Sequence, residues 1–274
     1  SKDPKSYLED GEKYLREGKY NEAILEFRGA LKADDTFIAA RYRLAQVYLT
    51  LGGFYEARQE LERIIATDGN HLDAQLRLGN LLLLERKFGE ARNKAGLILQ
   101  KEPDNLNARL LHANSYAGIF HINDSIHEIR QGLEREPRLM PPFIQLGASD
   151  DPSLQPGKAE ESFKEILAAS APSVEARLAL GDFYLANQRP VEAEEQFKAA
   201  TAAAPNSKDA VLSLAFFYLQ TKRLDEAEQQ YRRYVELNAD NFEQRVLLAD
   251  YLLATQQDNR AVLELEKMIA ENPG

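Results

Sequence analysis

The sequence predicts an all-α solenoid built from repeated pairs of helices. A column of small residues recurs every 34 residues without insertion or deletion: Ala23, Ala57, Ala91, Ser125, Ala159, Ala193, Ala227 and Ala261. A second column, twelve residues ahead of the first, contains only glycine and alanine: Gly11, Ala45, Gly79, Ala113, Gly147, Gly181, Ala215 and Ala249. Between the columns, apolar residues keep helical spacing and prolines separate the segments.

Residues 174–207 illustrate how one repeat forms two helices. Leu178 and Leu185 lie on one stripe of a first helix, because they are seven residues apart. Pro190 opens the second helix, where a missing N–H costs nothing, and Phe197 continues its apolar stripe. Pro205 closes the repeat. One such pair cannot bury its own apolar faces, so neighbouring pairs must stack.

Three further columns carry a family resemblance. The tyrosine column reads Tyr14, Tyr48, Leu82, Tyr116, Asp150, Tyr184, Tyr218 and Leu252. The second large column reads Phe27, Leu61, Ala95, Ile129, Phe163, Phe197, Tyr231 and Leu265, and the closing column includes Pro103, Pro137, Pro205 and Pro273. With the glycine and alanine columns, this pattern resembles the tetratricopeptide repeat over residues 4–273, although no repeat has the family's tryptophan.

The resemblance implies a right-handed superhelical solenoid of eight helix–turn–helix units, with sixteen helices in all. We expect a single domain over residues 1–274, with repeats at 4–37, 38–71, 72–105, 106–139, 140–173, 174–207, 208–241 and 242–274. Repeat 140–173 departs most from the motif. In this family the first helix of each pair lines the concave surface.

Composition excludes several kinds of chemistry. The chain has no cysteine, so disulfides, zinc thiolates and cysteine nucleophiles are excluded. The net charge is −10, which argues against nucleic-acid binding, because such binding requires a basic stripe. Residues 1–137 have 20 basic and 22 acidic side chains, whereas residues 138–274 have 14 and 22, so the second half prefers a cationic partner or is simply more soluble. No apolar stretch is long enough for a membrane helix.

By the resemblance, the first helices of the repeats line the ligand-binding groove, and the residues at their inward positions favour a patch in repeats two to four. Candidate groove residues share the inward positions of these repeats: Tyr42, Arg43, Gln46, Leu76, Arg77, Asn80, Leu110 and Asn114. Leu76 and Leu110 either pack against the adjacent repeat or form an apolar floor for a partner helix or peptide. The amides of Asn80 and Asn114 could bond to a peptide backbone, or belong to a solvated groove wall.

Repeat 140–173 keeps the period but its first helix contains breakers. Proline inside a helix costs about 3 kcal/mol, so we expect that helix to end near Ser149 and a loop to span about residues 150–157. The residues that predict this loop or hinge are Asp150, Asp151, Pro152, Pro156 and Gly157. The segment is either a hinge or binding loop, or a degenerate repeat.

Catalytic and cofactor motifs are absent from the sequence. No P-loop, nucleophile elbow, zinc-protease motif or dinucleotide fingerprint occurs, so we expect no enzyme activity, no cofactor and no metal. His121 and His127 are six residues apart and share no helical face, and His112 replaces a usual leucine, which favours a packed histidine.

Three functions fit the sequence. The leading hypothesis is a non-enzymatic protein-interaction scaffold whose concave groove binds a peptide or a partner helix. The N-terminal sequence also resembles mature bacterial tetratricopeptide lipoproteins of exopolysaccharide export or protein sorting, which would carry a lipid anchor upstream. This resemblance favours a periplasmic or outer-membrane-associated location, with the cytoplasm as the alternative. Thirdly, the chain could be the substrate-binding solenoid of a larger enzyme such as a glycosyltransferase.

The last repeat has no polar capping helix after it. Arrays of this kind end in such a helix, because the final pair otherwise exposes an apolar face. Either more chain follows, or the last pair forms a homodimer through that face.

Overall fold

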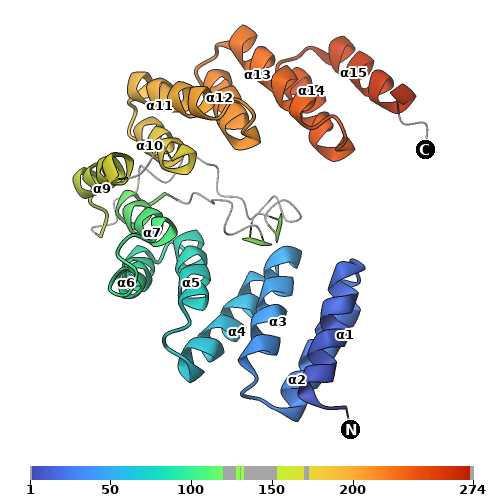
Figure 1. Ribbon diagram of the computed structural model, residues 1–274. Coiled ribbons are helices and arrows are strands. Elements are labelled where there is room, and N and C mark those ends of the chain that lie inside the picture. Colours follow the sequence, from blue (N-terminus) through green and yellow to red (C-terminus); the bar gives the residue numbers. More distant parts are fainter. Residues whose placement is uncertain (1, 120–127, 130, 133–152, 170–172, 272–274) are drawn as a thin grey trace. The chain divides into compact units, whose positions relative to one another are not determined.

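Every element in the described part of the chain is an α-helix, as the sequence predicts (Figure 1). This computed structural model describes residues 2–119, 128–129, 131–132, 153–169 and 173–271. Clustering of contacts divides the chain into two compact units, Ser1–Ile166 and Leu167–Gly274, with the boundary inside one helix. We describe each unit by itself.

The helices of the first unit are α1 (Pro4–Arg16), α2 (Tyr20–Ala33), α3 (Ile38–Leu51), α4 (Phe54–Thr67), α5 (Leu72–Leu84), α6 (Phe88–Leu99), α7 (Leu106–Ala117) and most of α9 (Pro156–Ala169). Those of the second unit are α10 (Val174–Ala186), α11 (Pro190–Ala203), α12 (Lys208–Gln220), α13 (Leu224–Leu237), α14 (Phe242–Ala254) and α15 (Asp258–Glu271). Within each unit, consecutive helices pack in chain order, α1 on α2, α2 on α3 and so on, as in a solenoid.

In two repeats the paired helices approach closely where the first helix contributes glycine and the second an aromatic ring. A Cβ added to Gly181 would lie 2.6 Å from Cε1 of Phe197, and one added to Gly11 would also collide with the ring of Phe27. The alanines of the first column are fully buried wherever they are described: Ala23, Ala57, Ala91, Ala159, Ala193, Ala227 and Ala261. The small-residue columns therefore mark the contact between paired helices, as predicted.

Polar caps begin most first helices of the pairs. The side chain before the helix accepts a hydrogen bond from the backbone N–H three residues later, which satisfies one of the unpaired donors of the first turn. The capping residues are Asp3, His71, Asn105, Ser173, Ser207 and Asn241. These caps fix where each repeat starts.

A left-handed residue makes the turn between the two helices of a repeat. It recurs at the 34-residue period: Gly18, Gly52, Arg86, Gln188, Lys222 and Gln256 have φ of 70°, 80°, 61°, 58°, 59° and 61°. Glycine adopts this conformation without strain, whereas the other four residues carry a Cβ penalty. The turn thus imposes the same backbone geometry even where the sequence lacks glycine.

The position that the tetratricopeptide motif gives to tryptophan has a polar role here. Gln75 Nε2 donates to the carbonyl of Gly69 at 3.1 Å, and Arg109 Nε donates to that of Pro103 at 2.8 Å. Arg41 bonds in the same way to the carbonyl of Asp35, again six residues earlier. A long polar side chain at this position fastens the loop between successive repeats.

The structure describes fourteen helices where sixteen were predicted. The two missing helices belong to repeats 106–139 and 140–173, where most residues lie outside the described part. Asp150, Asp151 and Pro152 are among those residues, so the predicted hinge there stays a prediction. The end of the predicted loop was wrong, however: Pro156 and Gly157 are the first two residues of α9, because proline is favoured in the first turn of a helix.

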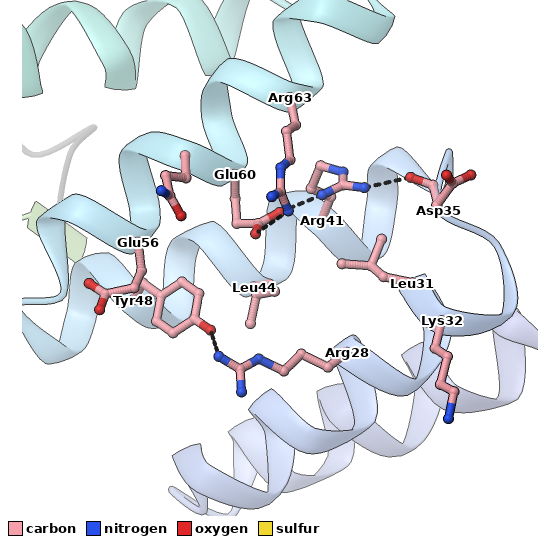
Figure 2. A pocket seen from close by; sticks show the side chains of 11 residues that line it. Arg28, Leu31, Lys32, Asp35, Arg41, Leu44, Tyr48, Glu56, Glu60 and Arg63 are labelled. Atoms are coloured by element: carbon pink, nitrogen blue, oxygen red, sulfur yellow. Dashed lines mark hydrogen bonds and ion pairs between the residues drawn. The ribbon is translucent and has the colours of Figure 1, made fainter.

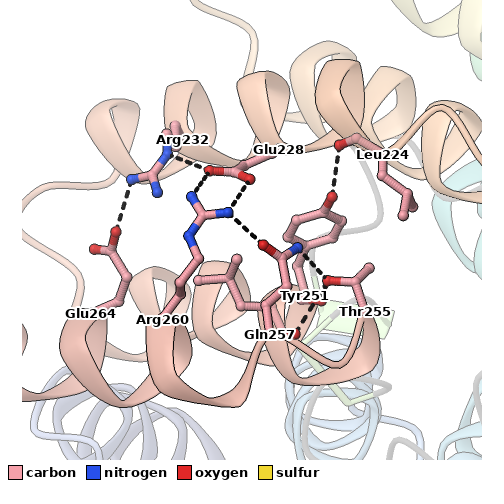
Figure 3. A network of polar contacts seen from close by, with 9 residues as sticks. Leu224, Glu228, Arg232, Tyr251, Thr255, Gln257, Arg260 and Glu264 are labelled. Carbon is pink, nitrogen blue, oxygen red and sulfur yellow. Dashed lines mark hydrogen bonds and ion pairs between the residues drawn. The ribbon is translucent and has the colours of Figure 1, made fainter.

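In the second unit, a polar network joins α13 to the helices that follow it (Figure 3). The Glu228 carboxylate accepts hydrogen bonds from Arg232 Nε at 3.0 Å and from Arg260 Nη2 at 2.6 Å. Arg232 also donates to Glu264 at 2.8 Å, and the Tyr251 hydroxyl donates to the carbonyl of Leu224 at 2.7 Å. The hydrogen bond from Arg260 is the main reason why the pKa of Glu228 lies below its ordinary value.

Candidate functional site

Three of the predicted groove residues meet where α3 and α5 lie next to each other. Arg77 of α5 donates from Nε to the Tyr42 hydroxyl of α3 at 2.8 Å, and its guanidinium carbon lies 5.4 Å from the Tyr42 ring centroid. Gln46 lies on the same stripe of α3, one turn after Tyr42. We call the surface formed by Tyr42, Gln46 and Arg77 the α3–α5 face.

A carboxylate from a distant part of the chain occupies this face. Glu128 accepts from Arg77 Nη1 through one carboxylate oxygen at 2.5 Å, and from Gln46 Nε2 through the other at 3.0 Å. Charge-assisted hydrogen bonds of this kind are short and strong. The α3–α5 face therefore offers two donors, from two neighbouring repeats, to the two oxygens of one carboxylate.

Neighbouring side chains orient these donors. Arg43 donates from Nη1 to Oε1 of Gln46 at 3.0 Å, which leaves the amide NH₂ of Gln46 directed at Glu128. Arg43 also donates from Nε to Glu12 of α1 at 3.0 Å. A continuous chain of polar contacts thus crosses repeats one, two and three.

Burial strengthens the electrostatic interactions of the α3–α5 face. Arg77 is only 9% exposed, and a buried guanidinium without an anionic partner is strongly unfavourable. Burial opposes its charged form, but contact with Tyr42 and Glu128 outweighs that effect and raises the pKa of Arg77. Burial also raises the pKa of the Tyr42 hydroxyl, which stays neutral and accepts the hydrogen bond from Arg77.

The residues next to Glu128 fit closely against the same helices. Residues 128–129 and 131–132 are helical, and Ile129 is fully buried in the apolar core of the first unit. At Gly132 the backbone approaches the end of α3 so closely that an added Cβ would lie 1.9 Å from the carbonyl oxygen of Leu49. Glu128, Ile129 and Gly132 together make this contact specific in charge, shape and apolar surface.

Comparison with known proteins agrees with the helical repeat. The model of a tetratricopeptide repeat family matches residues 14–78, 155–213 and 185–244, which together make up more than half of the chain. The chain belongs to the tetratricopeptide repeat family. No curated protein matches it in sequence.

Three solved structures are similar to the chain to different degrees. A tetratricopeptide repeat protein from Parabacteroides merdae has a TM-score of 0.62 at 16% identity, and the match covers 98% of this chain and 93% of that one. The thermophilic protein TTC0263 from Thermus thermophilus has a TM-score of 0.42 at 20% identity, over 91% and 99% of the two chains. PilW, a type IV pilus biogenesis factor, has a TM-score of 0.46 at 16% identity, over 98% and 94%. At such identities the likeness concerns the fold alone.

Four other predicted groove residues are buried. Leu76 and Leu110 are 9% and 2% exposed, so they pack in the core and do not form an open apolar floor. Asn80 and Asn114 are 3% and 2% exposed. The Nδ2 amide of Asn80 donates a hydrogen bond to the carbonyl of Leu76 in its own helix. Ten consecutive residues of α5, Ala74–Leu83, are buried in this arrangement. The predicted pairing of the two amides with a peptide backbone stays a prediction.

The first unit also has a hollow of about 430 Å³ between α2, α3 and α4 (Figure 2). Its polar side chains bond to one another: Arg41 Nη1 donates to Glu60 at 2.6 Å, and Arg28 Nη2 donates to the Tyr48 hydroxyl at 2.7 Å. Arg41 and Glu60 are both 8% exposed, and they join α3 to α4, whereas Arg28 and Tyr48 join α2 to α3. We interpret the hollow as a structural contact between repeats one and two.

The second unit presents apolar side chains at two places. Phe216 of α12 and Leu253 of α14 are 38% and 47% exposed at positions that the motif assigns to the concave surface. In the last helix, α15, three aliphatic side chains are more than half exposed: Val262, Leu263 and Ile269. A homodimer through this helix stays a prediction.

Other expected features concern chemistry. His112 is half-buried and meets Tyr116 edge-on with ring centroids 5.0 Å apart, so it is the packed histidine that was predicted. Among the described residues, no group of three or more histidine, aspartate or glutamate side chains is placed to hold a metal ion. His121 and His127 lie outside that part. In the same part, none of the helices has both the length and the apolar character needed to span a bilayer.

Sequence reasoning missed Glu128 and Gly132, although one signal for Gly132 exists. The corresponding position of the other seven repeats holds a buried residue with a side chain: Ala30, Ile64, Ile98, Ile166, Ala200, Tyr234 and Met268. A glycine in this column indicates that the fourth repeat packs differently. Glu128 has no such signal, because glutamate is common on helix surfaces.

Proposed function

We propose that this tetratricopeptide protein is a non-enzymatic scaffold that binds a carboxylate-bearing helix or peptide of a partner protein on the α3–α5 face. Tetratricopeptide folds serve widely as protein-interaction scaffolds, and membership of the family supports that general role. The observation that supports the specific site is Glu128, held between Gln46 Nε2 and Arg77 Nη1. A carboxylate that fits there from within the chain supports a carboxylate as the group that the face accepts.

The mechanism is recognition by shape and charge. Arg77 supplies a buried cation, and Gln46 supplies a second donor that Arg43 holds in place. A partner carboxylate would bond to both donors, while its neighbouring apolar side chains would replace the contacts of Ile129. The two donors come from different repeats, so the distance between them is fixed by how the repeats pack. The face therefore selects an anionic group that is large enough to bond to both donors.

Selection of peptides tests this function. A phage-displayed library of helical peptides is panned on the wild type, on Arg77→Met and on Arg58→Met. Arg58→Met is the matched control, since Arg58 of α4 is also an arginine that bonds to glutamate, in this case to Glu62 and Glu85. We expect peptides enriched in glutamate or aspartate on the wild type and on Arg58→Met, and loss of that enrichment on Arg77→Met. Acidic enrichment that is equal on all three chains would refute the assignment.

The envelope and glycosyltransferase hypotheses remain proposals of a different kind. A reading frame upstream that encodes a lipidated cysteine would support an envelope location, and a catalytic domain downstream would support the enzyme.

A further inference from the structure

The contact made by residues 128–132 has the properties of a bound ligand. Their sequence is Glu-Ile-Arg-Gln-Gly. Residues 128–129 and 131–132 are helical, and both Glu128 and Gly132 contact α3 or α5. The carboxylate satisfies two donors at one end of the segment, and the missing side chain permits close approach at the other.

Each of the three recognition elements selects its residue type. The Arg77 guanidinium selects an anion, and the two donors on separate repeats select a carboxylate with both oxygens accessible. The fully buried position of Ile129 selects an apolar side chain. The carbonyl of Leu49 excludes every side chain at the position of Gly132, because even a methyl group would lie 1.9 Å from it.

We propose that residues 128–132 are an internal copy of the partner's recognition motif. The partner, which rests on the function proposed above, presents a helix with a glutamate, an aliphatic residue directly after it, and a glycine four residues after the glutamate. The internal copy and the partner compete for the same two donors. The scaffold is therefore self-occupied until a partner segment displaces the internal one.

Displacement exchanges one carboxylate for another. Arg77 is 9% exposed and paired with Glu128 while the segment is in place, and a partner carboxylate restores the charge-assisted hydrogen bonds that Arg77 and Gln46 lose when Glu128 leaves. A segment tethered to its own site has an effective concentration in the millimolar range, which weakens the apparent binding of a free partner. The apparent dissociation constant of the partner is inversely proportional to the fraction of molecules in which the internal segment has left the face.

Gly132→Ala provides the test, because it removes the internal copy without touching the donors. The matched control is Gly96→Ala on α6, where an added Cβ meets no atom within 4 Å. The probe is a fluorescently labelled synthetic peptide with the sequence of residues 121–137, added to each full-length chain and followed by anisotropy. We expect Gly132→Ala to bind the peptide at least about tenfold more tightly than the wild type and Gly96→Ala. A peptide with glutamine in place of Glu128 should lose that gain.

The outcomes separate this inference from the proposed function. Equal, Arg77-dependent peptide affinity in all three chains would overturn the competition but leave the binding site standing. No peptide binding to any chain, together with acidic enrichment in the library selection, would overturn the motif alone. Dimerisation of Gly132→Ala in sedimentation experiments would overturn the proposal that the ligand belongs to a partner protein, because a second copy of this chain would then be the ligand.

A second variant covers the case in which Gly132→Ala does not fold. Glu128→Arg places two guanidinium groups against each other at the α3–α5 face and should release the segment by repulsion. Hydrogen exchange of the peptide fragment that contains residues 128–132 is expected to rise in this variant, together with peptide affinity. Increased exchange without a gain in affinity would refute the competition.

Discussion

The contact between Gly181 and Phe197 gives a quantitative test of how the paired helices pack. In Gly181→Ala, the new Cβ would lie 2.6 Å from Cε1 of Phe197, about 1 Å inside ordinary carbon–carbon contact. Phe197 is 1% exposed, so its ring has no open space to enter. Overpacking of this kind costs about 1–3 kcal/mol, while alanine regains about 1 kcal/mol of helix propensity. We expect a net loss of about 1 kcal/mol in the free energy of unfolding.

A double-mutant cycle isolates the contact. Phe197→Leu alone leaves a cavity and is expected to cost about 1–2 kcal/mol. In the double variant the smaller side chain admits the new methyl group, so the combined loss should fall short of the sum by about 1 kcal/mol. Urea unfolding followed by circular dichroism measures all four chains, and Gly96→Ala serves as the control for helix propensity alone. Strictly additive losses would refute the idea that glycine is required for the approach of α10 to α11.

Three further predictions concern turns, charges and caps. Lys222→Gly should raise the free energy of unfolding by about 0.5 kcal/mol, because glycine removes the strain of φ = 59° at some cost in unfolded-state entropy; a lowered urea midpoint would contradict this. The pKa of Glu228 is lowered, so its ionised form stabilises the fold above the ordinary carboxyl pKa and that stability is lost as the pH falls through the lowered value. Glu228→Gln should therefore cost about 1–2 kcal/mol at pH 7 and less at pH 3, and an equal cost at both pH values in thermal melts would be inconsistent with this role. Ser207→Ala removes the hydrogen bond to Ala210 N and should cost about 1 kcal/mol, with faster hydrogen exchange in the first turn of α12 as the sign of a lost cap; unchanged exchange there would count against the cap.

The sequence period was sufficient to predict the repeat architecture. Alanines at a fixed spacing identified the buried contact of each helix pair, because that contact is local and recurs with the same geometry. The prolines of repeat five were interpreted only as helix breakers. The predicted loop therefore extended to Gly157, whereas α9 already begins at Pro156.

The α3–α5 face was predictable only in part. Tyr42, Gln46 and Arg77 follow from the repeat positions, since those positions share one helical stripe. Their ligand does not, because a periodic pattern relates each repeat to its neighbours and contains no information about a contact over a separation of 51 residues. For the same reason, Asn80 was interpreted as a groove residue, and Leu76 was left open between the core and the groove floor.

The carboxylate between Gln46 and Arg77 has a mechanical consequence. Each donor belongs to a different repeat. The carboxylate that bonds to both donors therefore sets the spacing between α3 and α5. A shorter aspartate side chain at that place would draw the two helices together, and a departing ligand would let them separate. Occupancy of a site a few atoms wide can thus alter the pitch of the first three repeats.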